Sequence, residues 1–132
     1  MREIQVRTER KTQLLDITRD VGDALAGAGE GSAALVYVPH TTAGVTINEK
    51  VDPALLADFE MALAEIVDDG WSWRHEDADG ANAPSHLRAS LVGPQVLVPL
   101  RDGDLALGTY QGIFFCEFDG PRSRKVYVSS LR

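Results

Sequence analysis

The 132-residue sequence contains a single cysteine, Cys116. One cysteine cannot close a disulfide within the chain, and it cannot build a zinc site from several thiolates. The sequence therefore excludes a disulfide-stapled fold, and it fits a reducing compartment, which we expect to be the cytoplasm. Cys116 lies within the apolar stretch GIFFCEF, so a small buried side chain is a better interpretation than a nucleophile.

Long hydrophobic runs and an excess of positive charge are also missing. The longest apolar run surrounds residues 33–38, whereas a membrane-spanning helix needs roughly 20 residues. The opening MREIQVRTER has no apolar signal core. The net charge is −7, and a general nucleic-acid binder needs a basic face. We therefore expect neither a membrane nor a nucleic acid as partner, although the basic segment 119–132 could meet a small anion.

A chain of this length with 44% hydrophobic residues is the size of one compact domain, so we expect residues 1–132 to form a single unit. Apolar segments of strand length recur along it, and most fall in the last third. The Asp102-Gly103 pair and the segment DGPRS predict two hairpin turns there. Strands are predicted at EIQVRT, AALVYV, VTIN, QVLVPL, DLALGTY, GIFFCEF and KVYVSSL.

Two helices are predicted from apolar residues at helical spacing. The first begins at Asp16 and ends at Gly29, and the second follows the cap Asp52-Pro53 and extends to about residue 66. The segment 71–84 has no period and is predicted to be irregular. Strands and helices are segregated, which predicts an α+β fold with a mainly antiparallel sheet and two principal helices on one face.

The three histidines, His40, His75 and His86, all fall in stretches predicted to be non-helical. Imidazole is a common zinc ligand, and catalytic zinc sites use three protein ligands and keep a position open. The histidine spacing matches no short metal motif, so loop histidines bonded to the backbone are the alternative. The acids that follow His75, namely Glu76, Asp77 and Asp79, either orient an imidazole or lie in solvent.

Other side chains suit oxyanion binding or proton transfer. Thr41 and Thr42 offer hydroxyls to phosphate, or else stabilise a turn. Arg122 presents a guanidinium at a turn, where it grips an anion or is simply exposed. Glu117 lies among aromatic residues, which predicts a raised pKa or a charged partner and makes it an acid/base candidate. Glu49 is either a general base or a surface acid.

Three motifs, HTTAGVTINE, NAPSHLRASLVGP and LGTYQGIFFCEFDGPRSRKV, together resemble the YjbQ family, described as secondary thiamine-phosphate synthase enzymes. The resemblance covers about residues 5–130. It implies an α+β homotrimer with a polar cleft that gathers the histidines and a divalent metal ion, which we expect to be zinc. Tyr110 stands where the family usually has tryptophan. The family's histidines fall on His40, His75 and His86, and its polar residues on Thr41, Glu49, Asn82, Ser85, Arg88, Gln111, Glu117 and Arg122.

The activity implied by the resemblance joins a pyrimidine methyl diphosphate to a thiazole phosphate and releases pyrophosphate. In this interpretation the metal and Arg122 neutralise the diphosphate, Tyr110 holds the pyrimidine ring, and Glu49 or Glu117 handles protons. The loop presenting His86 is held by Asn82, Ser85 and Arg88. We expect the cleft at a boundary between subunits. Two alternatives stay open: a metal-dependent hydrolase of a small phosphorylated substrate, and a non-catalytic trimer that binds an anion or a protein partner.

Overall fold

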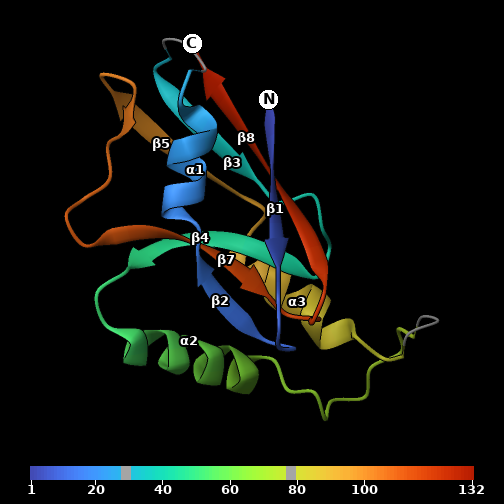
Figure 1. Ribbon diagram of the computed structural model, residues 1–132. Coiled ribbons are helices and arrows are strands. Elements are labelled where there is room, and N and C mark those ends of the chain that lie inside the picture. Colours follow the sequence, from blue (N-terminus) through green and yellow to red (C-terminus); the bar gives the residue numbers. More distant parts are fainter. Residues whose placement is uncertain (28–30, 77–79) are drawn as a thin grey trace.

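The computed structural model describes residues 1–27, 31–76 and 80–132, which form two antiparallel sheets around a shared apolar core (Figure 1). The larger sheet contains, in spatial order, β1 (Arg2–Arg7), β8 (Ser123–Leu131), β3 (Ala33–Tyr37), β5 (Gln95–Arg101) and β6 (Asp104–Leu105). The smaller sheet has the order β2 (Gln13–Asp16), β7 (Gln111–Glu117) and β4 (Ala43–Glu49). The predicted α+β class with antiparallel sheets is confirmed.

The three helices lie on different sides of the smaller sheet. Helix α1 (Thr18–Leu25) buries Val21 and Leu25 in the core that both sheets share. Helices α2 (Pro53–Ile66) and α3 (Ala83–Val92) pack against the opposite face of the smaller sheet. Figure 1 shows α1 on one side of β4 and β7, and α2 on the other. The smaller sheet is therefore covered on both faces.

Strand β7 explains this layering because alternate residues enter different cores. Ile113 and Phe115 belong to the core between the sheets, whereas Cys116 and Phe118 pack toward α2 and α3. A strand covered on both faces has no polar face, which is why GIFFCEF reads as a continuous apolar run. The predicted burial of Cys116 is confirmed, and burial raises the pKa of its thiol to about 12.

The first turn of α2 forms as its sequence predicts. The Asp52 carboxylate accepts a hydrogen bond from the Ala54 N–H at 3.0 Å, and Pro53 occupies the first turn. Aspartate at this position satisfies one of the free amide groups of a helix start, and proline fits there because it lacks one. Leu56, Phe59 and Leu63 then pack against the second core.

Helix α3 was not predicted, and its presence corrects the expectation of an irregular stretch through residue 84. Asn82 and Pro84 are turn-formers, but here they begin a helix, where both are favourable. The residues that α3 buries include Ser85, Arg88 and Ala89, so its buried face shows no large apolar stripe. His86 consequently lies on a helix and not in a loop.

The second predicted hairpin is also wrong. The turn at Asp102 and Gly103 does join β5 to β6, with positive φ angles of 54° and 85° at the two residues. The segment DGPRS, however, joins β7 to β8, which belong to different sheets. The chain changes sheet there because β8 pairs with β1 and β3, while β7 pairs with β2 and β4.

Smaller differences concern element lengths. Helix α1 begins later than Asp16, because the Ile17 N–H donates to the Ile113 carbonyl at 2.8 Å before the helix starts. The helix also ends earlier than predicted, at Leu25 and not at Gly29, because the backbone is already extended at Ala26. The segment DLALGTY is a strand only at residues 104–105. None of the helices in residues 1–27, 31–76 and 80–132 is long and apolar enough to cross a membrane.

Candidate functional site

Two histidines from distant parts of the chain meet at one open hollow of about 260 Å³. His40 and Thr41 come from the segment between β3 and β4, and His86 and Ser90 come from α3. Next to this hollow, the end of α3 approaches β4 closely at Gly44. A Cβ atom at Gly44 would lie 2.6 Å from the Gly93 carbonyl oxygen, so a side chain there would push the helix away.

His75 lies beside His86 and completes a row of three histidines. The ring centroids of His75 and His86 are 5.0 Å apart, and the rings stand nearly perpendicular, at 88°. Both line a second hollow of about 150 Å³ together with Ala83 and Leu87. The structure therefore brings the three predicted residues to one region, with His86 in the middle.

His40 is held by the backbone of β8. Its Nε2 accepts a hydrogen bond from the Lys125 N–H at 2.9 Å. Burial lowers the pKa of His40, and the positive charge of Arg124 lowers that pKa further. The imidazole is therefore neutral at neutral pH.

A polar hollow of about 480 Å³ lies at the start of α3 and includes Lys11, Asn82, Asp119 and Arg122 in its wall. Asn82 Nδ2 donates to the Asp119 carboxylate at 3.0 Å, and Arg122 Nη2 donates to the same oxygen at 2.8 Å. The side-chain oxygen of Asn82 is buried and meets no hydrogen-bond donor among the described residues. Among the described residues, this wall presents the cationic side chains of Lys11 and Arg122 beside the Asp119 carboxylate, and cationic side chains suit an anion.

The hollow lined by His40 and His86, called the His40 hollow below, lies close to the polar hollow along α3. Asn82 of the polar hollow and His86 of the His40 hollow are one helical turn apart. Asn82 precedes the first residue of α3, and the His86 N–H donates to its carbonyl at 3.4 Å. Residues separated by four positions lie on the same face of a helix, with Cβ atoms about 5–6 Å apart. A ligand or a pair of ligands can therefore contact both hollows across the first turn of α3.

Behind the site, Glu117 and Arg124 form a buried ion pair. Arg124 Nε donates to Glu117 Oε1 at 2.8 Å, and Arg124 Nη2 contacts Glu117 Oε2. Arg124 Nη2 also donates to the Thr42 hydroxyl, and the Thr8 hydroxyl donates to Glu117, each at 2.8 Å. Of the two expectations for Glu117, the structure shows the charged partner. Thr42 faces this network and not the hollow.

The pKa of Glu117 is lowered by this network. Burial alone raises the pKa, but hydrogen bonds from Arg124, from the Asp119 N–H and from Thr8 favour the charged form and outweigh it. Glu117 therefore stays ionised, which suits it to holding Arg124 and not to exchanging protons near neutral pH.

A YjbQ family model, described as "UPF0047 protein YjbQ-like", matches residues 2–132. The chain belongs to the YjbQ family. Its relatives include the UPF0047 protein YugU of Bacillus subtilis, 42% identical over 99% of this chain and 98% of its own length. The UPF0047 protein MJ1081 of Methanocaldococcus jannaschii is 41% identical, over 96% of this chain and 91% of its own.

Solved structures from the YjbQ family share the fold. A YjbQ/UPF0047 protein of Clostridium acetobutylicum superposes with a TM-score of 0.92 at 39% identity, covering 99% of this chain and 100% of that one. The hypothetical protein APE1520 of Aeropyrum pernix gives a TM-score of 0.89 at 39% identity and covers 98% and 96% of the two chains. The YjbQ family match and fold therefore extend over nearly all of this chain.

Two predicted residues hold this YjbQ chain's third helix in place. The Ser85 hydroxyl donates to the Phe118 carbonyl at 2.6 Å. The buried Arg88 guanidinium donates to the Val67 carbonyl at 2.7 Å and to Asp69 at 3.0 Å, just beyond the end of α2. Both side chains therefore tie α3 to its neighbours, which matches the expected role of fixing the segment that carries His86.

Three other predicted residues lie at the far end of β4 and β7. Glu49 pairs with Gln111, whereas Ala43 beside the His40 hollow pairs with Glu117, six residues along the strand. Strands rise 3.2–3.4 Å per residue, so these ends are about 20 Å apart. Tyr110 is 64% exposed at the same end. Glu49, Tyr110 and Gln111 therefore do not line the His40 hollow of their own chain.

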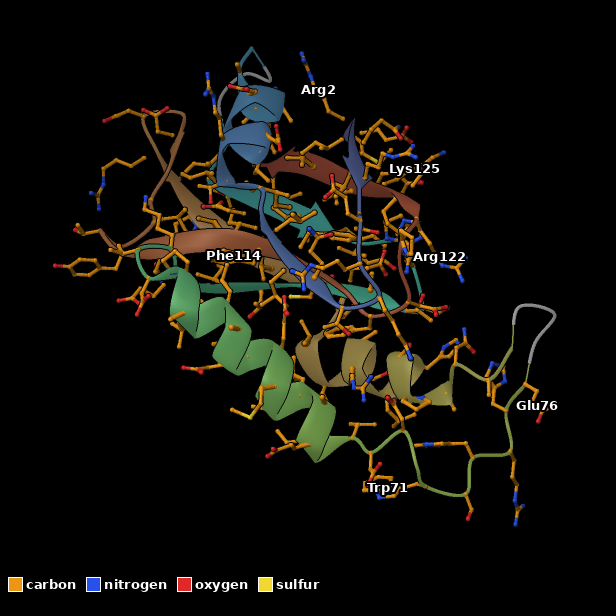
Figure 2. All side chains as sticks on the ribbon, turned by 60° about the horizontal axis from the view of Figure 1, so that its bottom comes forward. Arg2, Trp71, Glu76, Phe114, Arg122 and Lys125 are labelled. Atoms are coloured by element: carbon orange, nitrogen blue, oxygen red, sulfur yellow. The ribbon has the colours of Figure 1, made fainter. Side chains whose placement is uncertain are left out.

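The described residues do not fit a three-histidine zinc site. Residues 1–27, 31–76 and 80–132 contain no group of three or more His, Cys, Asp or Glu side chains that could hold a metal ion. His40 already uses its Nε2 lone pair, and His75 packs edge to face with His86. Glu76 lies on the loop that extends away from the sheets (Figure 2), and Asp77 and Asp79 fall outside the described residues. The zinc site stays a prediction.

Two residues that line the hollows were missed at the level of sequence, namely Lys11 and Ser90. Ser90 lies four positions after His86 and would have been found if the stretch had been recognised as a helix. Arg124 lies two residues before the inward-facing Val126 on β8, and this strand alternation explains why Arg124 is buried behind the hollows. Lys11 had no signal, because only the fold brings the β1–β2 connection to Asn82.

Proposed function

We propose that this YjbQ-family chain joins a pyrimidine methyl diphosphate to a thiazole phosphate and releases pyrophosphate with thiamine phosphate. One observation carries the proposal: two hollows with groups suited to oxyanions lie on either side of the first turn of α3. A reaction between two phosphorylated molecules needs two such positions close together. The polar hollow suits the diphosphate, because Lys11 and Arg122 line it.

The chemistry of the coupling matches the side chains at hand. The bond between the methylene carbon and the diphosphate oxygen breaks, and its electron pair leaves with pyrophosphate. The lone pair of the thiazole nitrogen forms the new carbon–nitrogen bond, which leaves the ring positively charged. No proton moves, so no general base is required. Lys11 and Arg122 stabilise the charge that grows on the leaving diphosphate.

Removal of a ligand-contacting side chain from either hollow is expected to slow the coupling reaction. We expect Lys11→Ala and His86→Ala each to lower kcat/KM for thiamine phosphate formation by about tenfold or more, since each removes a group that contacts a charged ligand. Arg19→Ala, which removes an exposed positive charge on α1, is the matched control and should leave the rate unchanged. Product is measured by mass spectrometry after incubation of purified protein with both precursors.

Other outcomes of this assay point to the alternatives. Release of phosphate from a single precursor, without coupled product, would identify a hydrolase. If neither product nor hydrolysis is detected while pyrophosphate still binds, the chain is a binding protein. Either result contradicts the coupling proposal.

We also propose that the chain forms a homotrimer with its cleft at a subunit boundary. Leu87 and Leu91 lie one turn apart on α3 and are 43% and 60% exposed, and Leu87 borders the hollow of His75 and His86. A neighbouring subunit that covers them would border the site. Such a neighbour could also bring in the end of β4 and β7 that carries Glu49, Tyr110 and Gln111.

Leu91→Glu is expected to convert the trimer to monomers, because a carboxylate would be buried without a partner in the subunit contact. Light scattering coupled to size-exclusion chromatography measures the mass. Ile66→Glu alters an equally exposed apolar side chain on α2 and should leave the trimer intact. A wild-type protein that is monomeric at assay concentration would contradict the proposal.

A further inference from the structure

The hydrogen bond between His40 and Lys125 takes the place of a backbone hydrogen bond between β3 and β8. Pairing between β3 and β8 ends at Tyr37 and Tyr127, while β8 begins four residues earlier, at Ser123. Beyond Tyr37, the Val38 N–H donates to the Pro94 carbonyl at 2.8 Å, and Pro39 has no N–H. The Lys125 N–H donates to the imidazole of His40 at this point.

This hydrogen bond decides which ring nitrogen of His40 carries the proton. A neutral imidazole has one N–H donor and one acceptor. Since Nε2 accepts from Lys125, Nδ1 carries the hydrogen. Among the hydrogen bonds of the described residues, none uses Nδ1 of His40 as donor, and His40 lines the hollow that it shares with Thr41 and Ser90.

The same arrangement opposes metal binding. A ligand histidine usually donates its second ring N–H to a carboxylate or a carbonyl oxygen. In this chain the second nitrogen faces a backbone N–H donor. Coordination through Nδ1 would move the proton to Nε2, where two donors would face each other and the hydrogen bond would be lost.

The backbone donor is itself fixed in place. Lys125 follows Arg124, whose guanidinium is bonded to Glu117 and Thr42 in the buried network. Lys125 also pairs with Gln5 of β1 in the larger sheet. Arg122 and Lys125 lie at the same edge of the molecule, where β8 begins (Figure 2). The acceptor nitrogen of His40 therefore faces a rigid part of the fold.

We infer that His40 is not a metal ligand but a fixed hydrogen-bond donor, whose Nδ1–H binds an oxygen of a phosphorylated ligand, with the Lys125 N–H as the group that positions it. The assignment of the ligand as a phosphorylated molecule rests on the proposed function, whereas the assignment of the ring proton to Nδ1 does not. Failure of the coupling assay would leave the tautomer unaffected, and a different tautomer would leave the coupling assay unaffected.

The tautomer can be read directly from wild-type protein. Long-range proton–nitrogen NMR on ¹⁵N-labelled protein at neutral pH separates a protonated ring nitrogen from an unprotonated one. We expect Nδ1 of His40 to give the protonated signal and Nε2 the unprotonated signal, and addition of Zn²⁺ to leave both unchanged. Protonated Nε2, or a Zn²⁺-dependent change centred on His40, overturns the inference. His40→Ala assigns the signals.

Two substitutions separate the two nitrogens. The amide nitrogen of asparagine reaches the position of Nδ1, and the amide oxygen of glutamine reaches that of Nε2. We expect His40→Gln to keep the bond from Lys125 but to weaken inorganic phosphate binding about tenfold, because the donor is lost. His40→Asn should bind phosphate within about threefold of wild type, since its amide still donates to the ligand.

Thermal unfolding of the two variants provides a second readout. His40→Asn leaves the Lys125 N–H without an acceptor and should unfold at a lower temperature than His40→Gln. If instead both variants lose phosphate binding equally and the wild type binds Zn²⁺ through His40, then His40 is a metal ligand. If His40→Gln binds phosphate as wild type does, then Nδ1 is not the donor.

Discussion

Replacement of Arg124 by methionine is expected to lower the free energy of unfolding by about 3–5 kcal/mol, the cost of breaking a buried ion pair from one side. The Glu117 side chain is fully buried, and without Arg124 it must stay charged without its partner or take up a proton. Urea unfolding at neutral pH, followed by circular dichroism, measures the change. The double variant Glu117→Gln/Arg124→Met removes both charges and should recover part of the loss.

The acid dependence of stability provides a check on the same ion pair. Because the pKa of Glu117 is lower in the folded chain than its ordinary value, the carboxylate stabilises the fold above that ordinary value. This contribution is lost as the pH falls through the folded pKa. We expect wild type to lose more stability in acid than the double variant. If Arg124→Met lowers the free energy of unfolding by less than about 1 kcal/mol, the result would contradict a stabilising role for the ion pair.

Gly44→Val is expected to destabilise the chain by about 3 kcal/mol, as overpacking of a tight contact does. The new Cβ would lie 2.6 Å from the Gly93 carbonyl oxygen and 3.1 Å from a methyl group of Val92. Since α3 approaches β4 here, the same change should widen the His40 hollow and weaken phosphate binding. Urea unfolding and a phosphate titration measure the two effects.

A glycine elsewhere in the chain is the matched control. Gly22 lies within α1, and a Cβ there would meet no atom of the described residues within 4 Å outside its own stretch of helix. Gly22→Ala should therefore stabilise the chain by about 0.5–1 kcal/mol, because alanine loses less backbone entropy than glycine in a helix. A Gly44→Val protein as stable as wild type would show that α3 can move away from β4 without cost.

The helices and strands were predictable where the local sequence pattern agrees with the surroundings that the fold provides. The N-cap at Asp52 and the alternating sides of β7 follow from the sequence because capping and strand period are local properties. Helix α3 was missed because its buried face holds Ser85, Arg88 and Ala89 and not large apolar residues. The exchange of sheets after β7 could not be predicted, since turn residues alone do not specify the strand that follows.

The site was predictable in its residue types and less so in their roles. His40 and His86 do meet at one hollow, as expected. Their contacts could not be read from the sequence, because the backbone N–H that meets His40 lies 85 residues further along the chain. Glu117 was predicted as an acid or base in the reaction, yet its ion pair with Arg124 holds it in the interior. Only the folded structure distinguishes a side chain that lines a hollow, such as His40, from one that is buried behind it, such as Glu117.

The most direct test of the two-hollow account is a crystal structure of the protein with pyrophosphate and thiazole phosphate added together. We expect pyrophosphate beside Lys11 and Arg122, and the thiazole phosphate beside His40 and His86, across the first turn of α3. Ligands bound instead around Glu49 and Tyr110 of an isolated subunit, with both hollows empty, would contradict the account.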